Sequence, residues 1–144
     1  FSMNAQGFEI IADDIQPRIR AWGKTVQDLF HAALRGTTTF MAPEAAHSAK
    51  GLKPVKHIAR IEAVDINSLL VEFLTKALEE AEMRNTIFTA ASFGAFGENF
   101  LEAEFSGFVV ERLECDIRAI SYQEVEVKKN LETGFFETEF GLEI

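Results

Sequence analysis

The residues of this sequence that could do chemistry are mostly carboxylates, and several gather near its two ends. Asp13 and Asp14 are adjacent, in a stretch whose composition is typical of a β-strand. Glu143 is the penultimate residue and precedes Ile144, which carries the carboxylate at the end of this chain. Adjacent side chains of a strand point to opposite faces, so one of the two aspartates is expected to face inward or to lie at a sheet edge.

These acids suggest a cation site if the first and last strands run near each other. Asp13 or Asp14 would then join Glu143 and the carboxylate of Ile144. A site made only of oxygen ligands suits a hard divalent cation such as Ca²⁺, Mg²⁺ or Mn²⁺. The ordinary interpretation of the two aspartates is solvation of a strand edge. For Glu137 and Glu139, which alternate along the last strand, it is a solvated strand face.

Other familiar kinds of catalytic site have no support in the sequence. The segment "GAFGEN" (94–99) lacks the Lys-Ser/Thr that a phosphate-binding P-loop needs. The three histidines (His31, His47 and His57) stand apart from one another and do not have zinc-ligand spacing. Cys115 is the single cysteine, so no internal disulfide can form. No serine nucleophile elbow is present.

Composition favours a protein partner over nucleic acid or membrane. The formal net charge is −9 and the sequence pI is about 4.8, which disfavours binding to phosphate backbones and to anionic membranes. No apolar run approaches the roughly 18 residues of a membrane span, and no signal peptide is visible, so a cytoplasmic location is expected. Residues 1–6 are expected to be disordered or a remnant of expression, with Met3 as the natural start.

The pattern of elements predicts one α+β domain over residues 1–144. A helix begins after Thr25, a good N-cap, and a strongly amphipathic helix follows Asp65. The expected fold is a two-layer sandwich, in which two helices pack on one face of a mostly antiparallel sheet. Residues 41–54 are expected to form a loop, and strands are expected at 8–13, 18–22, 55–65, 86–96, 99–110, 116–129 and 134–144.

In this order and spacing the segments resemble the archease family, the protein cofactors of the RNA ligase of tRNA splicing. "RAWGKTVQDLF" (20–30) is similar to the family's Ala-Tyr/Trp-Gly strand end and the helix that follows it. "VDINSLLVEFLTKALEEA" (64–81) is similar to the second helix, and "IRAISYQEVEV" (117–127) to the Lys-Ala-Ile-Thr-Tyr-His strand. The family ends in Asp-Ile, and this chain ends in "LEI". The resemblance covers residues 8–144.

The resemblance implies a metal site built from the Asp of a His-Thr-Ala-Asp motif, the penultimate acid and the last residue. Glu143 and Ile144 match the last two positions. Two registers are open for the first ligand: an ungapped count from "RAWG" puts Gln16 there, whereas matching "EIIAD" (9–13) puts Asp13 there and Ile10 at the histidine. The second register keeps a carboxylate and is preferred. It needs two extra residues, and Pro17 marks a place for such a bulge.

Three functions are therefore weighed. The first is a divergent archease, a non-enzymatic cofactor that promotes guanylylation and turnover of an RNA ligase. The second is a binding or chaperone-like module that kept the fold but lost the metal site, because both registers lose the motif's histidine and Gln123 replaces the later one. The third is a metal-assisted hydrolase, which no base–nucleophile pair supports.

Overall fold

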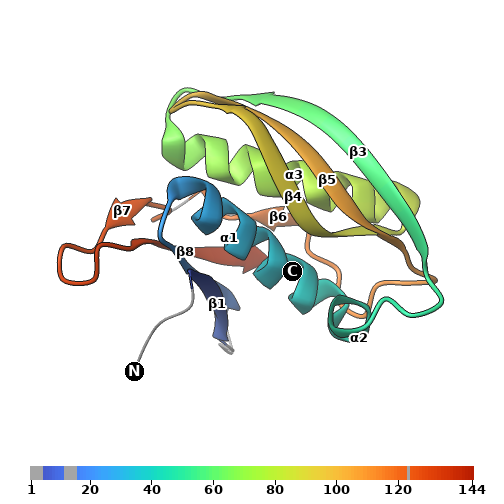
Figure 1. Cartoon of the computed structure of the whole chain (residues 1–144). Helices are drawn as coiled ribbons and strands as arrows, with labels where there is room; N and C mark the ends of the chain where they lie inside the picture. The colour runs from blue at the N-terminus through green and yellow to red at the C-terminus, as the bar shows by residue number, and fades with distance from the viewer. Residues whose placement is uncertain (1–4, 12–15, 123) are drawn as a thin grey trace.

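The computed structural model describes residues 5–11, 16–122 and 124–144 (Figure 1). In chain order its elements are β1 (Gln6–Ile11), β2 (Arg18–Gly23), α1 (Val26–Met41), α2 (Pro43–His47), β3 (Lys53–Glu62), α3 (Ile66–Arg84), β4 (Thr86–Phe96), β5 (Phe100–Val109), β6 (Ala119–Ile120), β7 (Lys128–Lys129) and β8 (Phe136–Glu143). β1 begins at Gln6, within the segment 1–6 that was expected to be disordered or a remnant of expression, and the carbonyl of Ala5 accepts a hydrogen bond from the Lys24 amide at 2.8 Å.

Both long helices begin where the sequence predicts. The Thr25 hydroxyl accepts a hydrogen bond from the Asp28 amide at 3.0 Å, and the Asp65 carboxylate accepts one from the Ser68 amide at 2.8 Å. Each bond satisfies one of the free amide groups of a first helical turn. α3 ends at Arg84, and its C-cap Asn85 has a φ of 50°, in the left-handed region that asparagine tolerates.

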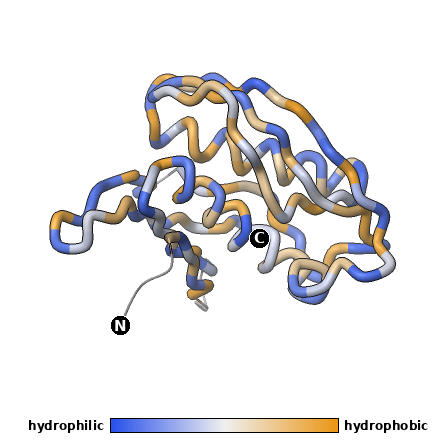
Figure 2. Tube along the Cα trace, in the orientation of Figure 1, coloured by the Kyte–Doolittle hydropathy of each residue, from blue (hydrophilic) through white to orange (hydrophobic). Residues whose placement is uncertain are grey.

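The strands form two antiparallel sheets. β1, β2, β8 and β6 lie side by side in that order, and β7 also pairs with β8; β3, β5 and β4 form a separate three-stranded sheet. Along β3, hydrophilic and hydrophobic residues alternate, as expected of a strand with one solvated face (Figure 2). The predicted α+β class and antiparallel pairing are confirmed, but the strands divide between two sheets instead of forming one.

The two long helices pack against strands of both sheets. α1 contacts β1, β2 and β8 of the larger sheet and β4 of the smaller one, and α3 contacts β3 and β4 as well as β6. Figure 1 shows both helices between the three-stranded sheet and the strands below it. The helices are therefore buried around more of their circumference than a one-sided stripe would be, for example at Leu29, Phe30, Ala32 and Leu34 of α1.

Aromatic side chains fill the space between α3 and the three-stranded sheet. Phe73 of α3 is fully buried and stacks on Phe105, with ring centroids 5.1 Å apart. Phe105 in turn stacks on Phe88 at 4.7 Å, and Phe30 of α1 lies 5.5 Å from Phe73. These contacts join both helices and two strands in one core. None of the helices in the described ranges is long and apolar enough to span a membrane.

Two sequence predictions are corrected. The predicted loop 41–54 contains the short helix α2, which begins at Pro43, a residue whose fixed φ suits a first helical turn. The predicted strand 116–129 is reduced to the two-residue strands β6 and β7. Ile120 pairs with Leu142 and Lys128 pairs with Glu137, so a stretch of eight residues lies beside a stretch of only five in β8. The longer stretch cannot stay paired with β8 and leaves the sheet between β6 and β7.

Candidate functional site

The end of β8 lies beside the connection between the first two strands. Ile11, Arg18 and Gly141 stand in register across β1, β2 and β8. Beyond this row, the Leu142 amide donates a hydrogen bond to the Pro17 carbonyl at 2.9 Å. Since β1 ends at Ile11 and β2 begins at Arg18, the residues that join them start and finish at the edge of the sheet where β8 ends.

Glu143 is held at this edge by its backbone. It is paired with Ala119 of β6, and its carbonyl accepts a hydrogen bond from the Arg118 amide at 2.7 Å. Its side chain is exposed, as is that of Ile144. This arrangement suits a cation ligand, because the hydrogen-bonded backbone fixes the Cα position while the exposed carboxylate stays accessible to an ion.

Asp13 and Asp14, the other predicted ligands, lie outside the described residues. Gln16, which the alternative register puts at the ligand position, is described and lies over Gly141. A Cβ added at Gly141 would come within 2.6 Å of the Gln16 side-chain oxygen, so glycine permits this close approach. Within residues 5–11, 16–122 and 124–144, no three histidine, cysteine or acidic side chains are grouped closely enough to hold a metal ion.

The segment that leaves β8 forms a strap, defined as residues 121–127, of which 123 lies outside the described part. The Val127 amide donates a hydrogen bond to the Asn67 side-chain oxygen at 2.8 Å, and the Tyr122 hydroxyl donates one to the Glu72 carboxylate. This bond raises the pKa of Tyr122 to about 12, because ionisation would break it. The Ser121 amide at the start of the strap still donates to the Gly141 carbonyl of β8 at 2.9 Å, and beyond it these bonds attach the strap to α3.

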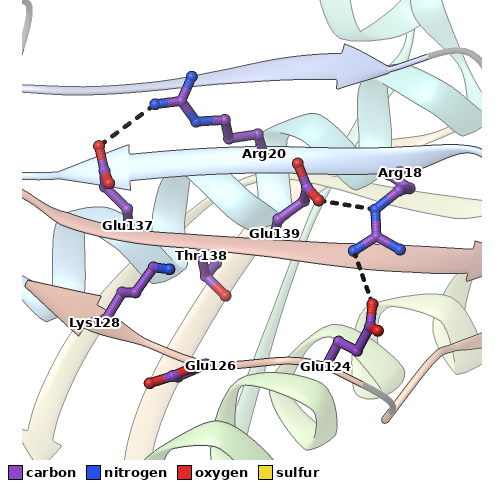
Figure 3. A pocket seen from close by; sticks show the side chains of 8 residues that line it. All are labelled: Arg18, Arg20, Glu124, Glu126, Lys128, Glu137, Thr138 and Glu139. Atoms are coloured by element: carbon purple, nitrogen blue, oxygen red, sulfur yellow. Dashed lines mark hydrogen bonds and ion pairs between the residues drawn. The ribbon is translucent and has the colours of Figure 1, made fainter.

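A charged cavity of about 330 Å³ opens between the strap and the outer face of β2 and β8 (Figure 3). On the β2 side, Arg18 donates to Glu139 at 2.9 Å and Arg20 to Glu137 at 3.5 Å. Glu137 and Glu139 are therefore partners in cross-strand ion pairs, and the side chain of Glu137 is only 17% exposed. The prediction of a solvated strand face was wrong for Glu137.

Comparison with known protein families identifies the fold's relatives. The model of the archease protein family (MTH1598/TM1083) matches residues 8–141, which is nearly the whole chain. The chain belongs to the archease family. No curated protein matches it significantly.

Two solved structures of archease proteins are similar in fold. The solution structure of Methanobacterium thermoautotrophicum protein 1598 superposes with a TM-score of 0.68 at 15% identity, over 96% of this chain and 99% of that one. The crystal structure of an archease from Thermotoga maritima, titled a possible chaperone, gives a TM-score of 0.63 at 9% identity, over 88% of this chain and 89% of that one. At such low identity the archease fold persists while most side chains differ.

Sequence reasoning did not find the charged cavity of this archease. Its lysine and two of its glutamates come from the strap region, which was expected to continue as a regular strand against β8. A signal was nevertheless present, because Glu124, Glu126 and Lys128 alternate with the apolar residues Val125 and Val127. Alternation predicts which side chains share a face, but it does not reveal that the strand separates from its neighbour.

Proposed function

We propose that this chain acts in the cytoplasm as a divergent archease, a non-enzymatic protein cofactor that activates an RNA ligase in tRNA splicing or RNA repair. Membership of the archease family supports the coarse assignment. The ligase partner and the cation site are proposals that go beyond this assignment.

The observation that carries the proposal is the register at the sheet edge. Ile11, Arg18 and Gly141 form one row, and Pro17 binds the Leu142 amide. This arrangement brings the two ends of the segment that contains Asp13 and Asp14 to the edge where Glu143 stands. Asp13 and Asp14 follow Ile11 by two and three residues, and three residues of extended chain span at most about 10 Å. This chain length allows the contact with Glu143 that we propose.

The donor set fits a hard divalent cation. We propose that Asp13 or Asp14, Glu143 and the carboxylate that Ile144 carries in this chain hold Ca²⁺, Mg²⁺ or Mn²⁺, since these ions prefer oxygen ligands. When bound, the cation would supply positive charge beside the nucleotide site of the ligase. The chain's own residues position it: Arg118 fixes the Glu143 backbone, and Pro17 fixes that of Leu142.

The overall charge supports a protein partner. With a formal net charge of −9, the chain favours docking onto a basic ligase surface, and direct RNA binding is disfavoured. Acidic residues remote from the cation would then act mainly on the rate of association, which should fall as salt rises.

The test is a multiple-turnover RNA-ligation assay with the ligase from the same genome. The wild-type chain is expected to raise the number of turnovers, and Asp13→Ala and Glu143→Ala are expected to abolish this effect. Glu132→Ala, in the exposed turn before β8, is the matched control and should stimulate like wild type. No stimulation by folded wild-type protein, with a ligase shown to be competent, would overturn the proposal.

The second candidate is a binding or chaperone-like module on the same fold. Ile10, at the family's histidine position in the preferred register, is a partly exposed apolar side chain that can neither ligate a metal nor donate a hydrogen bond. The Thermotoga maritima structure is itself titled a possible chaperone. Calcium titration separates the candidates, because a chaperone-like module predicts no difference between wild type and Glu143→Ala.

A further inference from the structure

The three-stranded sheet has one long and regular edge, formed by β3. Within the described residues, β3 pairs with β5 alone, and its 10 residues are joined to β5 without a register shift. Figure 1 shows β3 as the outermost strand of this sheet. The opposite edge strand, β4, is interrupted by register shifts after Phe88 and after Phe93. Such irregularities protect an edge from pairing with another chain, and β3 lacks them.

The hydrogen bonds of β3 show which of its backbone groups face the open edge. Just beyond the end of the strand, the Ala63 amide donates to the Asn99 carbonyl at 2.9 Å. In an antiparallel pair, residues bonded to the neighbouring strand alternate with residues whose amide and carbonyl point away from it. The odd-numbered residues of β3 therefore bind β5. The residues whose amide and carbonyl both point to the open edge are Lys56, Ile58, Arg60 and Glu62.

The side chains of these four residues combine both charges with one exposed apolar group. Ile58 is 75% exposed in the middle of the strand, between Lys56 and Arg60. Lys56 pairs with Glu104 at 3.3 Å, and Arg60 pairs with Glu62 at 3.2 Å. Both are pairs between solvated groups, which contribute little energy, so each charge can interact with a further partner.

A second copy of β3 complements this edge in one register. If two copies pair antiparallel about a twofold axis at Ala59, Lys56 lies opposite Glu62 of the second copy, and Ile58 lies opposite Arg60. The aliphatic stem of Arg60 then covers the exposed Ile58. Every outward amide and carbonyl from Lys56 to Glu62 finds a partner in the second copy.

The neighbouring registers fit less well. An axis at Ile58 would place Lys56 opposite Arg60 of the second copy, and like charges directly opposite are destabilising. An axis at His57 would place Arg60 opposite Pro54, which has no amide to donate. We propose that β3 is a homodimer interface, in which two copies pair antiparallel about Ala59 and join their three-stranded sheets into one continuous sheet.

This interface is separate from the proposed cation site. Glu143 lies on β8, which belongs to the other sheet, so failure of either proposal leaves the other intact. The charges of β3 also select among partners, because a strand without the complementary sequence would meet them unpaired. A strand of a different protein is the competing occupant, and the oligomeric state of the purified chain separates the two.

The first experiment is sedimentation of the full-length chain over a range of concentrations. Wild type is expected to show a monomer–dimer equilibrium. Glu62→Lys places like charges opposite each other twice in the dimer and should weaken dimerisation about tenfold or more. Lys56→Glu combined with Glu62→Lys reverses both charges and should restore it. Glu132→Lys, the same charge change in an exposed turn, is the matched control and should dimerise like wild type.

Two results of this experiment would overturn the proposal. One is a monomer at every concentration, which would leave the edge open or to a different protein. The other is a double variant that dimerises as weakly as Glu62→Lys, which would show that Lys56 and Glu62 do not face each other.

Hydrogen exchange of the amides tests the strand pairing directly. The amides of Ile58, Arg60 and Glu62 are expected to exchange more slowly as protein concentration rises, because they become bonded only in the dimer. The amides of Ala59 and Ile61 already bind β5 and should change little. A dimer in which the first three amides stay unprotected would place the interface elsewhere and overturn the proposal.

Disulfide formation tests the register. Ala59 faces its own copy in a non-hydrogen-bonded pair, where Cα atoms lie about 4.5 Å apart, within disulfide range. In a Cys115→Ser background, which removes the exposed native thiol, Ala59→Cys should therefore cross-link under mild oxidation. Lys53→Cys, exposed at the start of the strand and far from the axis, is the control and should stay reduced. Cross-linking of Lys53→Cys in preference to Ala59→Cys would overturn the assigned pairing.

Discussion

The Leu142 amide donates a hydrogen bond to the Pro17 carbonyl at 2.9 Å, and this bond joins residues 125 positions apart in the sequence. Proline has no amide hydrogen, so Pro17 can serve this edge only through its carbonyl. The bond fixes the end of β8 beside the start of β2, and its donor, Leu142, directly precedes Glu143. The proposed cation site depends on this relationship.

Glu143→Ala should weaken divalent-cation binding without unfolding the chain. The Glu143 side chain is exposed, while its backbone is held by Arg118 and Ala119, so truncation removes a ligand and leaves the sheet edge intact. Loss of one carboxylate ligand is expected to lower Ca²⁺ affinity on the order of tenfold or more. Calorimetric titration with Ca²⁺, Mg²⁺ and Mn²⁺ measures it.

Glu132→Ala is the control for this loss, because it removes the same charge from an exposed turn. Adding residues after Ile144 should also weaken binding, since it removes the carboxylate that Ile144 carries here. If cation affinity is unchanged in both Glu143→Ala and the extended chain, these two residues are not ligands.

Phe73→Asp should prevent folding. Phe73 is fully buried between Phe30, Phe93 and Phe105, and a charge there would have no partner. Burying an unpaired carboxylate costs several kcal/mol of folding free energy. A whole domain is typically stabilised by only about 5–15 kcal/mol, so this cost is enough to unfold it. Circular dichroism of the purified variant is the measurement.

Phe73→Leu is the matched variant, because it keeps an apolar side chain and leaves a smaller gap. It should fold and lose roughly 1–2 kcal/mol of unfolding free energy. A cooperative, native-like unfolding transition in Phe73→Asp would contradict the central place given to this residue.

The helices and their caps were predictable because their signals are local. Thr25 and Asp65 each precede an amphipathic run, and both bind the amide three residues later. Long-range partners were not predictable in the same way. Alternation shows that Glu137 and Glu139 share a face. Only the register of β2 against β8, which puts Arg20 opposite Glu139, shows that both glutamates have a diagonal arginine partner.

The candidate site was predictable in part for the same reason. The acids near both ends, Asp13, Asp14 and Glu143, stand out in the sequence, and the row formed by Ile11, Arg18 and Gly141 supplies the pairing that the cation hypothesis needs. For the cavity beneath the strap, the alternation of Glu124, Glu126 and Lys128 with Val125 and Val127 predicts only a shared face. The cavity forms because the chain between β6 and β7 is three residues longer than the part of β8 that it spans. This extra length can be recognised only when the pairing of both β6 and β7 with β8 is known.

Gly107→Ala should destabilise the three-stranded sheet strongly. β5 is the central strand, and a Cβ on Gly107 would lie 1.8 Å from the Ile87 carbonyl oxygen, so the backbone of β4 would have to move. We expect a loss of about 3 kcal/mol in unfolding free energy, typical of severe overpacking. Urea denaturation followed by fluorescence measures this loss.

Gly94→Ala provides the comparison in the same sheet. The nearest atom to its added Cβ is a Glu102 carboxylate oxygen at 3.5 Å, an ordinary contact with a flexible side chain. This variant should be as stable as wild type or slightly more stable, since alanine restricts the unfolded chain. Equal stability of the two variants would mean that the close approach at Gly107 does not constrain the fold.

The ionisation of Tyr122 reports whether the strap is attached to α3. Tyr122 is the single tyrosine of the chain, so its near-ultraviolet absorbance follows one group. The hydrogen bond to the Glu72 carboxylate raises the pKa of Tyr122 from 10.0 to about 12, because it stabilises the neutral phenol. The titration midpoint of the folded protein should therefore lie near 12, and Glu72→Ala should lower it toward 10.

The same shift gives a pH dependence of stability with a definite sign. A group whose pKa is raised on folding contributes stability that is complete below its unfolded pKa of 10.0 and is lost as pH rises through about 12. Because Tyr122 is largely exposed, the contribution is screened and small. Tyr122→Phe should remove this part of the decline in stability between those two pH values, whereas Glu79→Ala, on the same helix, should leave it in place. A wild-type midpoint near 10 would show that the strap is not attached through Tyr122.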